Sequence, residues 1–240
     1  MGTLATMSKR GATMLKSGAT VVLCAGLLVA CSSEASEPKA DIAKVTTLKS
    51  SFGPEFTLSE TAPTGIDPKL LAGQKLPDSV TFDPPACAKF ATGQLVPTGT
   101  EGNMAAISAE GAGNRFIVIA VETNSPVPVT EPGPDCQKVT FTGPGLRGMV
   151  ETVETPKIDG TQTLGVHRIL QTSANNQTSL QTSANNQTRT GESYNYSAHF
   201  GVYQVIVSAN PLVLPDKPIV PVNTGRARDL LVAGVNAVRS

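Results

Sequence analysis

The sequence predicts an α+β domain in which an antiparallel sheet of about six strands carries helices on one face. Three observations lead to this prediction. Short β-branched segments separated by turn residues fill the middle of the chain, helix starts led by proline precede them, and an apolar helical stripe follows them. This order favours short N-terminal helices, then the sheet, then a C-terminal helix packed on one sheet face.

The predicted strands follow one another from residue 104 onward. Segment 115–123 is the clearest, because its β-branched residues run almost without interruption, as in a central strand buried on both faces. In segment 193–200, alternation places Tyr194, Tyr196, Ala198 and Phe200 on one face, so His199 should point to the other. The other expected strands are 104–108, 138–142, 148–154, 164–170 and 202–208.

Three helices are expected. Segments 67–72 and 83–90 both begin with Asp-Pro, which indicates an N-cap followed by proline in the first helical turn, and the second segment carries Cys87. The last helix would be capped by Thr224. Its apolar residues recur at helical spacing and form one stripe: Ala227, Leu230, Leu231, Gly234, Val235 and Val238.

The N-terminal segment has the organisation of an export signal. Basic residues at 9, 10 and 16 precede an apolar run at 21–30, which is too short to span a bilayer and has the length of a signal-peptide core. The run ends in Leu28-Val29-Ala30-Cys31, which resembles the bacterial lipobox. The resemblance implies cleavage before Cys31 and a diacylglyceryl group on its sulfur. An ordinary secretory signal and an uncleaved anchor are the alternatives.

These features divide the chain into three parts. Residues 1–30 are the predicted signal peptide, and 31–50 are read as a flexible tether because they mix Ser, Glu, Lys, Pro and Ala without aromatics. Residues 51–240 form the single folded domain. Within it, the ten-residue sequence 170–179 recurs almost unchanged as 180–189, which predicts a polar loop insertion at 171–190.

Cys87 and Cys136 are the two cysteines left after export and lipidation. In an oxidising compartment they are expected to form a disulfide, which would close a loop of roughly 50 residues. Two free thiols or a metal pair are the alternatives. Two cysteines and two widely spaced histidines give no zinc-ligand spacing, so no metal site is expected.

Catalytic motifs are weak throughout the chain. The G-x-G-x-x-G match at 143–148 lacks a following helix and is interpreted as a hairpin turn. His167 and His199 are interpreted as strand residues, since no G-x-S-x-G elbow accompanies them. Glu151 and Glu154 fall on opposite faces of one strand and cannot act together. We therefore expect no catalytic residues and no cofactor.

The net charge of the chain says little about its binding partners. The chain has 19 basic and 19 acidic residues, so it lacks the basic surplus of nucleic-acid-binding proteins. The partners expected are the membrane, through the diacylglyceryl group on Cys31, and an envelope protein or lipid ligand. The expected location is the extracytoplasmic face of the cell membrane.

Several phrases resemble uncharacterised lipoproteins of the mycobacterial cell envelope. They are the lipobox, Phe82-Asp83-Pro84-Pro85-Ala86-Cys87, Cys136-Gln137-Lys138-Val139, and Thr224-Gly225-Arg226-Ala227-Arg228-Asp229-Leu230-Leu231. More distantly, the chain is similar to the extracellular sensor domain of mycobacterial receptor kinases, an α+β module with disulfides. The resemblance implies an envelope location and a binding or sensing role, without a catalytic motif.

Three functions therefore compete. The first is a membrane-anchored, non-catalytic binding, interaction or sensing module. The second is a lipid or glycolipid carrier, which would need a large apolar cavity. The third is an envelope hydrolase, which would need a histidine bonded to both a carboxylate and a hydroxyl.

Overall fold

The computed structural model describes residues 40–67, 76–93, 96–97, 99–173, 189–215 and 217–240. The predicted signal peptide, Cys31, all but the first residue of the helix predicted at 67–72, and most of the duplicated segment lie outside these residues. Within them, no helix has the length and apolar character needed to cross a membrane.

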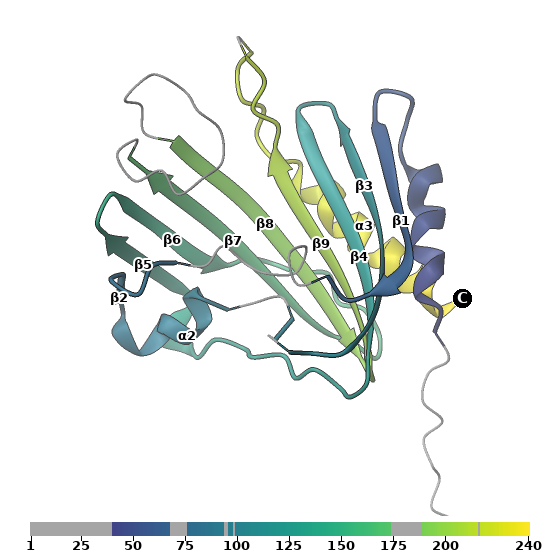
Figure 1. Ribbon diagram of the computed structural model, residues 1–240, viewed down its shortest axis with the longest axis horizontal. Helices are drawn as coiled ribbons and strands as arrows, with labels where there is room; N and C mark the ends of the chain where they lie inside the picture. The colour runs from purple at the N-terminus through teal and green to yellow at the C-terminus, as the bar shows by residue number, and fades with distance from the viewer. Residues whose placement is uncertain (1–39, 68–75, 94–95, 98, 174–188, 216) are drawn as a thin grey trace, which may run out of the picture. The chain divides into compact units, whose positions relative to one another are not determined.

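Nine strands form one sheet in the order β1-β3-β4-β9-β8-β7-β6-β5-β2, and every neighbouring pair is antiparallel (Figure 1). The prediction of an antiparallel sheet is confirmed, but the number of about six strands is wrong. The strands are β1 (Thr57–Gly65), β2 (Thr81–Asp83), β3 (Gly102–Gly111), β4 (Asn114–Thr123), β5 (Lys138–Gly143), β6 (Leu146–Thr152), β7 (Gln162–Thr172), β8 (Arg189–Phe200) and β9 (Tyr203–Pro211).

The two edge strands account for most of the error. β1 is exposed at every position except Thr61, and β2 has only three residues. Neither strand therefore carries the alternation of apolar and polar residues that reveals a half-buried strand. By contrast, β4 is confirmed as a central strand, with buried side chains on both faces.

Tight turns set the register of the hairpins. Ala112 and Gly113 both have positive φ, of 49° and 77°, and join β3 to β4 in the geometry that suits a two-residue hairpin. Gly145, at φ 67°, turns the chain between β5 and β6, where Gly143 pairs with Leu146. The G-x-G-x-x-G match is thus a hairpin turn, as predicted.

One face of the sheet is covered by α3 (Thr224–Arg239) together with the 3-10 helix η1 (Ile42–Ser51). The predicted apolar stripe of α3 is buried along its whole length. The cap differs from the prediction: the Asn223 side chain, not Thr224, accepts a hydrogen bond from the Arg226 N–H.

Helix η1 corrects the prediction of a flexible tether over 31–50. Its buried residues Ile42, Val45 and Leu48 are spaced three apart, which places them on one face of a helix with three residues per turn. Asp41 caps this helix through its side chain, which accepts from the Ala43 N–H at 2.9 Å. The folded domain therefore begins about ten residues earlier than expected.

The opposite face carries a smaller helical unit, η2 (Pro85–Cys87) followed by α2 (Ala88–Ala91). Cys87 and Ala91 pack there against Val139 and Val150. In Figure 1 this unit lies in front of the sheet and α3 lies behind it. Helices thus cover both faces, not one. Asp83 is also not the expected N-cap, because it ends β2 and Pro84 takes the cap position.

The insertion predicted at 171–190 is shorter in the structure, because the two flanking strands extend into it. β7 continues to Thr172 and β8 starts at Arg189, so the first two and last two residues of segment 171–190 belong to the sheet. The remainder of the predicted insertion, residues 174–188, lies outside the described residues.

Candidate functional site

A row of polar and aromatic residues crosses four strands on the face that α3 covers in part. Lys138 on β5 pairs with Glu151 on β6, Glu151 pairs with His167 on β7, and His167 pairs with Tyr194 on β8. Direct cross-strand neighbours lie close enough for their side chains to interact. Glu192 lies two residues before Tyr194 and therefore points to the same face.

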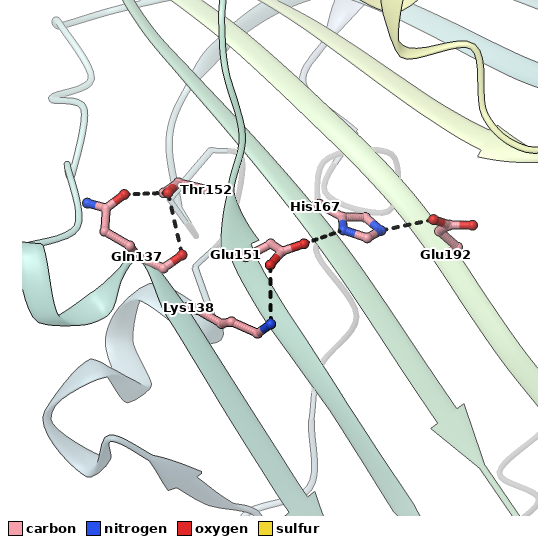
Figure 2. A network of polar contacts seen from close by, with 6 residues as sticks. All are labelled: Gln137, Lys138, Glu151, Thr152, His167 and Glu192. Carbon is pink, nitrogen blue, oxygen red and sulfur yellow. Dashed lines mark hydrogen bonds and ion pairs between the residues drawn. The ribbon is translucent and has the colours of Figure 1, made fainter.

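His167 is the centre of this cluster. Its Nδ1 lies 3.0 Å from Glu151 Oε1, and its Nε2 lies 2.9 Å from Glu192 Oε1. The histidine side chain is 9% exposed, against 29% and 31% for the two glutamates. Figure 2 shows the three side chains in line, with the imidazole between the carboxylates.

Each ring nitrogen of His167 therefore faces a carboxylate oxygen, and a ring nitrogen that carries a hydrogen can donate it to that oxygen. The other oxygen of Glu151 faces a cation, Lys138 Nζ, at 3.7 Å. We call Lys138, Glu151, His167 and Glu192 the charged row. It links four neighbouring strands through their side chains.

Tyr194 covers the histidine. The two rings stack with centroids 4.1 Å apart and planes 9° from parallel. Burial raises the pKa of the Tyr194 phenol, and the neighbouring Glu192 raises it further through its charge and a hydrogen bond. The phenol therefore stays neutral at physiological pH, and its ring shields one side of the imidazole from water.

His199 lies on the other face, as predicted, and has different partners. Its Nε2 is 3.2 Å from Ser197 Oγ and 3.1 Å from Gln204 Nε2. Burial lowers the pKa of His199, and a hydrogen bond between the ring and the backbone of Val127 opposes this shift in part. His199 is therefore neutral at physiological pH.

Neither histidine has the partners of a Ser-His-Asp triad. That triad needs a carboxylate on one ring nitrogen and a nucleophilic hydroxyl on the other. Carboxylates occupy both nitrogens of His167, and the contacts described for His199 include a hydroxyl but no carboxylate. The chemistry this geometry supports is ion pairing and hydrogen bonding.

No metal centre is found in the described residues, since no three His, Cys, Asp or Glu side chains converge there. The charged row contains three such residues, but the imidazole separates the two carboxylates (Figure 2). A metal ion needs its ligands to surround a common point.

A hollow of about 450 Å³ lies between residues 97 and 99–101 on one side and residues 124–128 on the other. Its lining mixes proline and glycine with polar side chains, among them Glu101 and Asn124, whose Oε2 and Nδ2 atoms are 3.3 Å apart. Drug-sized ligand pockets are of similar volume but are lined mainly by apolar and aromatic groups. This hollow therefore lacks the lining expected for a lipid.

The cysteine pair predicted from the sequence lies at bonding distance, with Sγ atoms 1.97 Å apart. The bond ties the end of η2 to the 3-10 helix η3 (Pro134–Cys136), which lies just before β5. Cys31 lies outside the described residues. The sequence does not predict the charged row, because the expected strand pairs Glu151 with no residue outside its own strand. Cross-strand register, which the sequence alone did not supply, brings Glu151 to His167 and Glu192.

The phrases that carry the mycobacterial resemblance have structural roles. Residues 82–87 include the last two residues of β2, the cis peptide bond at Asp83-Pro84 and one cysteine of the disulfide. In the last phrase, the guanidinium of Arg226 lies 4.6 Å from the ring centre of Phe56 and 5.0 Å from that of Phe52. These residues hold η1, the sheet and α3 together.

These features define an α+β domain with an open antiparallel sheet and no catalytic constellation among its described residues. The chain belongs to the family described as "Domain of unknown function (DUF5642)", which matches residues 41–239. That match begins at the residue that caps η1, in agreement with the observed start of the fold.

Solved structures extend this comparison. An uncharacterised protein of Mycobacterium smegmatis, the Rv0999 ortholog, has 60% identity and a TM-score of 0.76, over 85% of this chain and 99% of that chain. The extracellular domain of PknH from Mycobacterium tuberculosis has 11% identity and a TM-score of 0.34, over 82% and 91%. No curated protein matches. The resemblance to uncharacterised mycobacterial proteins is thus confirmed, and the PknH likeness is too low to support an argument.

Proposed function

We propose that the chain is a cell-envelope lipoprotein, anchored through Cys31, whose folded domain is a non-catalytic binding or sensing module outside the cytoplasmic membrane. The observation that carries the non-catalytic part is the environment of His167. A buried histidine with a carboxylate on each ring nitrogen has no free nitrogen with which to activate a nucleophile.

The anchor is supported by the sequence and by the disulfide. The basic segment, the short apolar run and Leu28-Val29-Ala30-Cys31 have the order of a lipoprotein signal. The Cys87–Cys136 pair is at bonding distance, and disulfides persist in oxidising compartments outside the cytoplasm. Two or three acyl chains would hold the domain stably at a membrane.

The alternatives have less support. A lipid carrier would need an apolar cavity, and the hollow beside residues 124–128 is lined by polar groups and prolines. An envelope hydrolase would need a triad-like histidine, and neither His167 nor His199 has both partners. The binding module requires neither feature.

Membrane fractionation of cells that produce the full chain tests the anchor. We expect the wild-type chain to enter the detergent phase and to incorporate labelled palmitate. Cys31→Ala should abolish both, because it removes the acceptor sulfur. Cys24→Ala is the matched control, since Cys24 lies in the segment that cleavage removes. Equal partitioning of the Cys31 and Cys24 variants would contradict the anchor.

A fluorophosphonate probe tests the non-catalytic assignment. Such probes label a serine that a neighbouring histidine activates. We expect no labelling of the purified chain above that of the Ser197→Ala variant, which lacks the hydroxyl near His199. Stoichiometric labelling that disappears in Ser197→Ala would favour the hydrolase.

A further inference from the structure

An arginine with unused hydrogen-bonding capacity lies on the sheet face that carries α2. Arg168 follows His167 on β7, so it points away from the charged row. Its Nη2 atom donates to Ala91 O, at the last residue of α2. Its Nη1 atom is buried and has no hydrogen-bond partner. The contact with α2 therefore uses only part of the guanidinium.

The strands around Arg168 supply no carboxylate to this face. Direct cross-strand partners share a face, so the register fixes which residues of β6 to β9 lie on the same side as Arg168. All of these residues are described, and none of them is Asp or Glu. The two acids of these four strands, Glu151 and Glu192, belong to the charged row on the other face.

A cation in this position is costly without an anion. Burial lowers the pKa of Arg168, and no carboxylate among the described residues opposes that shift. A guanidinium nevertheless keeps its charge in proteins, and a buried charge is stabilised mainly by an opposite charge or by several hydrogen bonds. One neutral carbonyl, Ala91 O, offsets only part of the cost. The remaining N–H groups suit the oxygens of a carboxylate or phosphate.

Neutral polar side chains continue from Arg168 across the same face. Ser193 on β8 is the direct cross-strand neighbour of Arg168, and Asn195 is the next residue of β8 on that side. On β9, Ser208 pairs with Asn195, and Asn210 follows it. The amide of Asn195 reaches Ser193 Oγ, and that of Asn210 reaches Ser208 Oγ, only at 3.5 Å. Hydrogen bonds of this length are weak, so a ligand can replace them.

We call Ser193, Asn195, Ser208 and Asn210 the neutral row. Its four side chains and that of Arg168 are all partly exposed. The helical unit of α2 packs over β5 and β6, in front of the sheet in Figure 1, and the neutral row begins beside it on β8. The row thus presents hydroxyl and amide groups next to the free side of a cation.

We infer that Arg168 and the neutral row form a binding site for a small, hydroxyl-rich ligand that carries one oxyanion, either a phosphate or a carboxylate. The oxyanion binds Arg168, and the ligand hydroxyls bond to Ser193 and Asn195. The inference rests on the binding role proposed above and names the class of ligand. Binding requires the guanidinium to turn about its own side-chain bonds, so that Nη1 faces the ligand. One ion pair in a partly exposed site gives a dissociation constant of about 0.1–1 mM, and such a ligand dissociates during purification.

Equilibrium dialysis of the full chain, purified from envelope membranes in a non-ionic detergent, tests the site with labelled probes. Glucose 6-phosphate should bind. Inorganic phosphate should bind about tenfold more weakly, because it lacks the hydroxyls that reach the neutral row. Glucose should not bind measurably. Arg168→Gln should weaken the binding of glucose 6-phosphate at least tenfold. The matched control is Arg147→Gln, which should bind as the wild type does, because Arg147 is exposed on the other face beside Gln171.

A second variant keeps the test decisive if Arg168→Gln does not fold. Ser193→Asp places a carboxylate on the direct cross-strand neighbour of Arg168, where it takes the position of the ligand oxyanion. This variant should bind no glucose 6-phosphate. Its Tm should not rise when the sugar phosphate is added, whereas that of the wild type should. Thr190→Asp adds the same charge to the other face of β8 and should leave binding unchanged.

A lipid head group and a free sugar phosphate share this chemistry, and two probes separate them. Glycerophosphoinositol is a phosphate diester without acyl chains and represents a head group, whereas glucose 6-phosphate is a monoester. Tighter binding of the diester would assign the ligand to a lipid head group, and tighter binding of the monoester would assign it to a soluble molecule. Arg168→Gln should weaken both.

Failure of the site can be distinguished from failure of the proposed function. No binding of any probe, equal binding of glucose and glucose 6-phosphate, or binding that Ser193→Asp leaves unchanged would overturn the site. With Cys31 lipidated and no serine labelled, those results would leave the envelope module intact with another partner. An unlipidated Cys31 or a labelled serine would contradict the proposed function, whereas loss of binding in Arg168→Gln would still support the site.

Discussion

Replacement of His167 by leucine removes the imidazole that lies between two carboxylates while keeping a side chain of comparable bulk. In the wild-type protein, His167 lies within 3.0 Å of Glu151 and within 2.9 Å of Glu192. Hydrogen bonds to charged groups contribute about 1.5–3 kcal/mol each. Both glutamates are about 30% exposed, so water recovers part of their solvation when the donor is lost. The lower figure therefore applies to each bond.

Two bonds at that lower figure give an expected loss of about 3 kcal/mol in the free energy of unfolding. For a domain of this size, 1 kcal/mol shifts the midpoint by about 2–4 °C, so Tm should fall by about 6–12 °C. Urea unfolding followed by far-UV circular dichroism measures the free energy directly, and thermal unfolding provides the midpoint.

The matched control is His199→Leu, which removes a histidine bonded to a hydroxyl and an amide. Neutral hydrogen bonds contribute about 1 kcal/mol, so this variant should lose less stability than His167→Leu. A loss below about 1 kcal/mol for His167→Leu, or equal losses in the two variants, would refute the reasoning. It would mean that water, and not His167, satisfies the carboxylates.

Three further predictions concern other parts of the fold. Val45→Ala should lower the free energy of unfolding by about 2 kcal/mol in urea, because Val45 is fully buried in η1. An unchanged free energy of unfolding would instead support the prediction that this segment is a flexible tether. Replacing both Cys87 and Cys136 by serine should cost about 4 kcal/mol, measured against the oxidised wild type, since the bond closes a loop of about 50 residues. Burial depresses the pKa of His199 below its usual 6.5, so the folded state binds fewer protons there than the unfolded state. The free energy of unfolding should therefore fall as pH drops below 6.5. Between pH 7.5 and 5, this fall should be smaller in His199→Gln than in the wild type. An equal fall in the two proteins would contradict the role assigned to His199.

Segments that bury a regular pattern of side chains could be predicted from the sequence. The stripe of α3 and the β-branched run of β4 each point a continuous set of apolar residues into the core. Edge strands β1 and β2 bury little, so hydrophobic pattern could not reveal them. Helix η1 was predictable in principle, because Asp41 supplies a cap and three apolar residues follow at intervals of three.

The charged row shows a different limit. Glu151, His167 and Glu192 are separated by 16 and 25 residues along the chain. Their contact depends on the register of two strand pairs, and a shift of one residue would turn each side chain to the other face. Composition and motif spacing contain no information on that register. The disulfide could be predicted without strand register, because the predicted export and lipidation leave only Cys87 and Cys136 to pair.

Native mass spectrometry of the protein purified from its own envelope tests the central claim most directly. The account predicts a chain that starts at Cys31, carries diacylglyceryl and any further acyl mass on that residue, contains one disulfide and holds no additional small ligand. A chain without acyl groups would contradict the anchor. A stoichiometric extra mass from a lipid or glycolipid would contradict the binding module and favour a carrier.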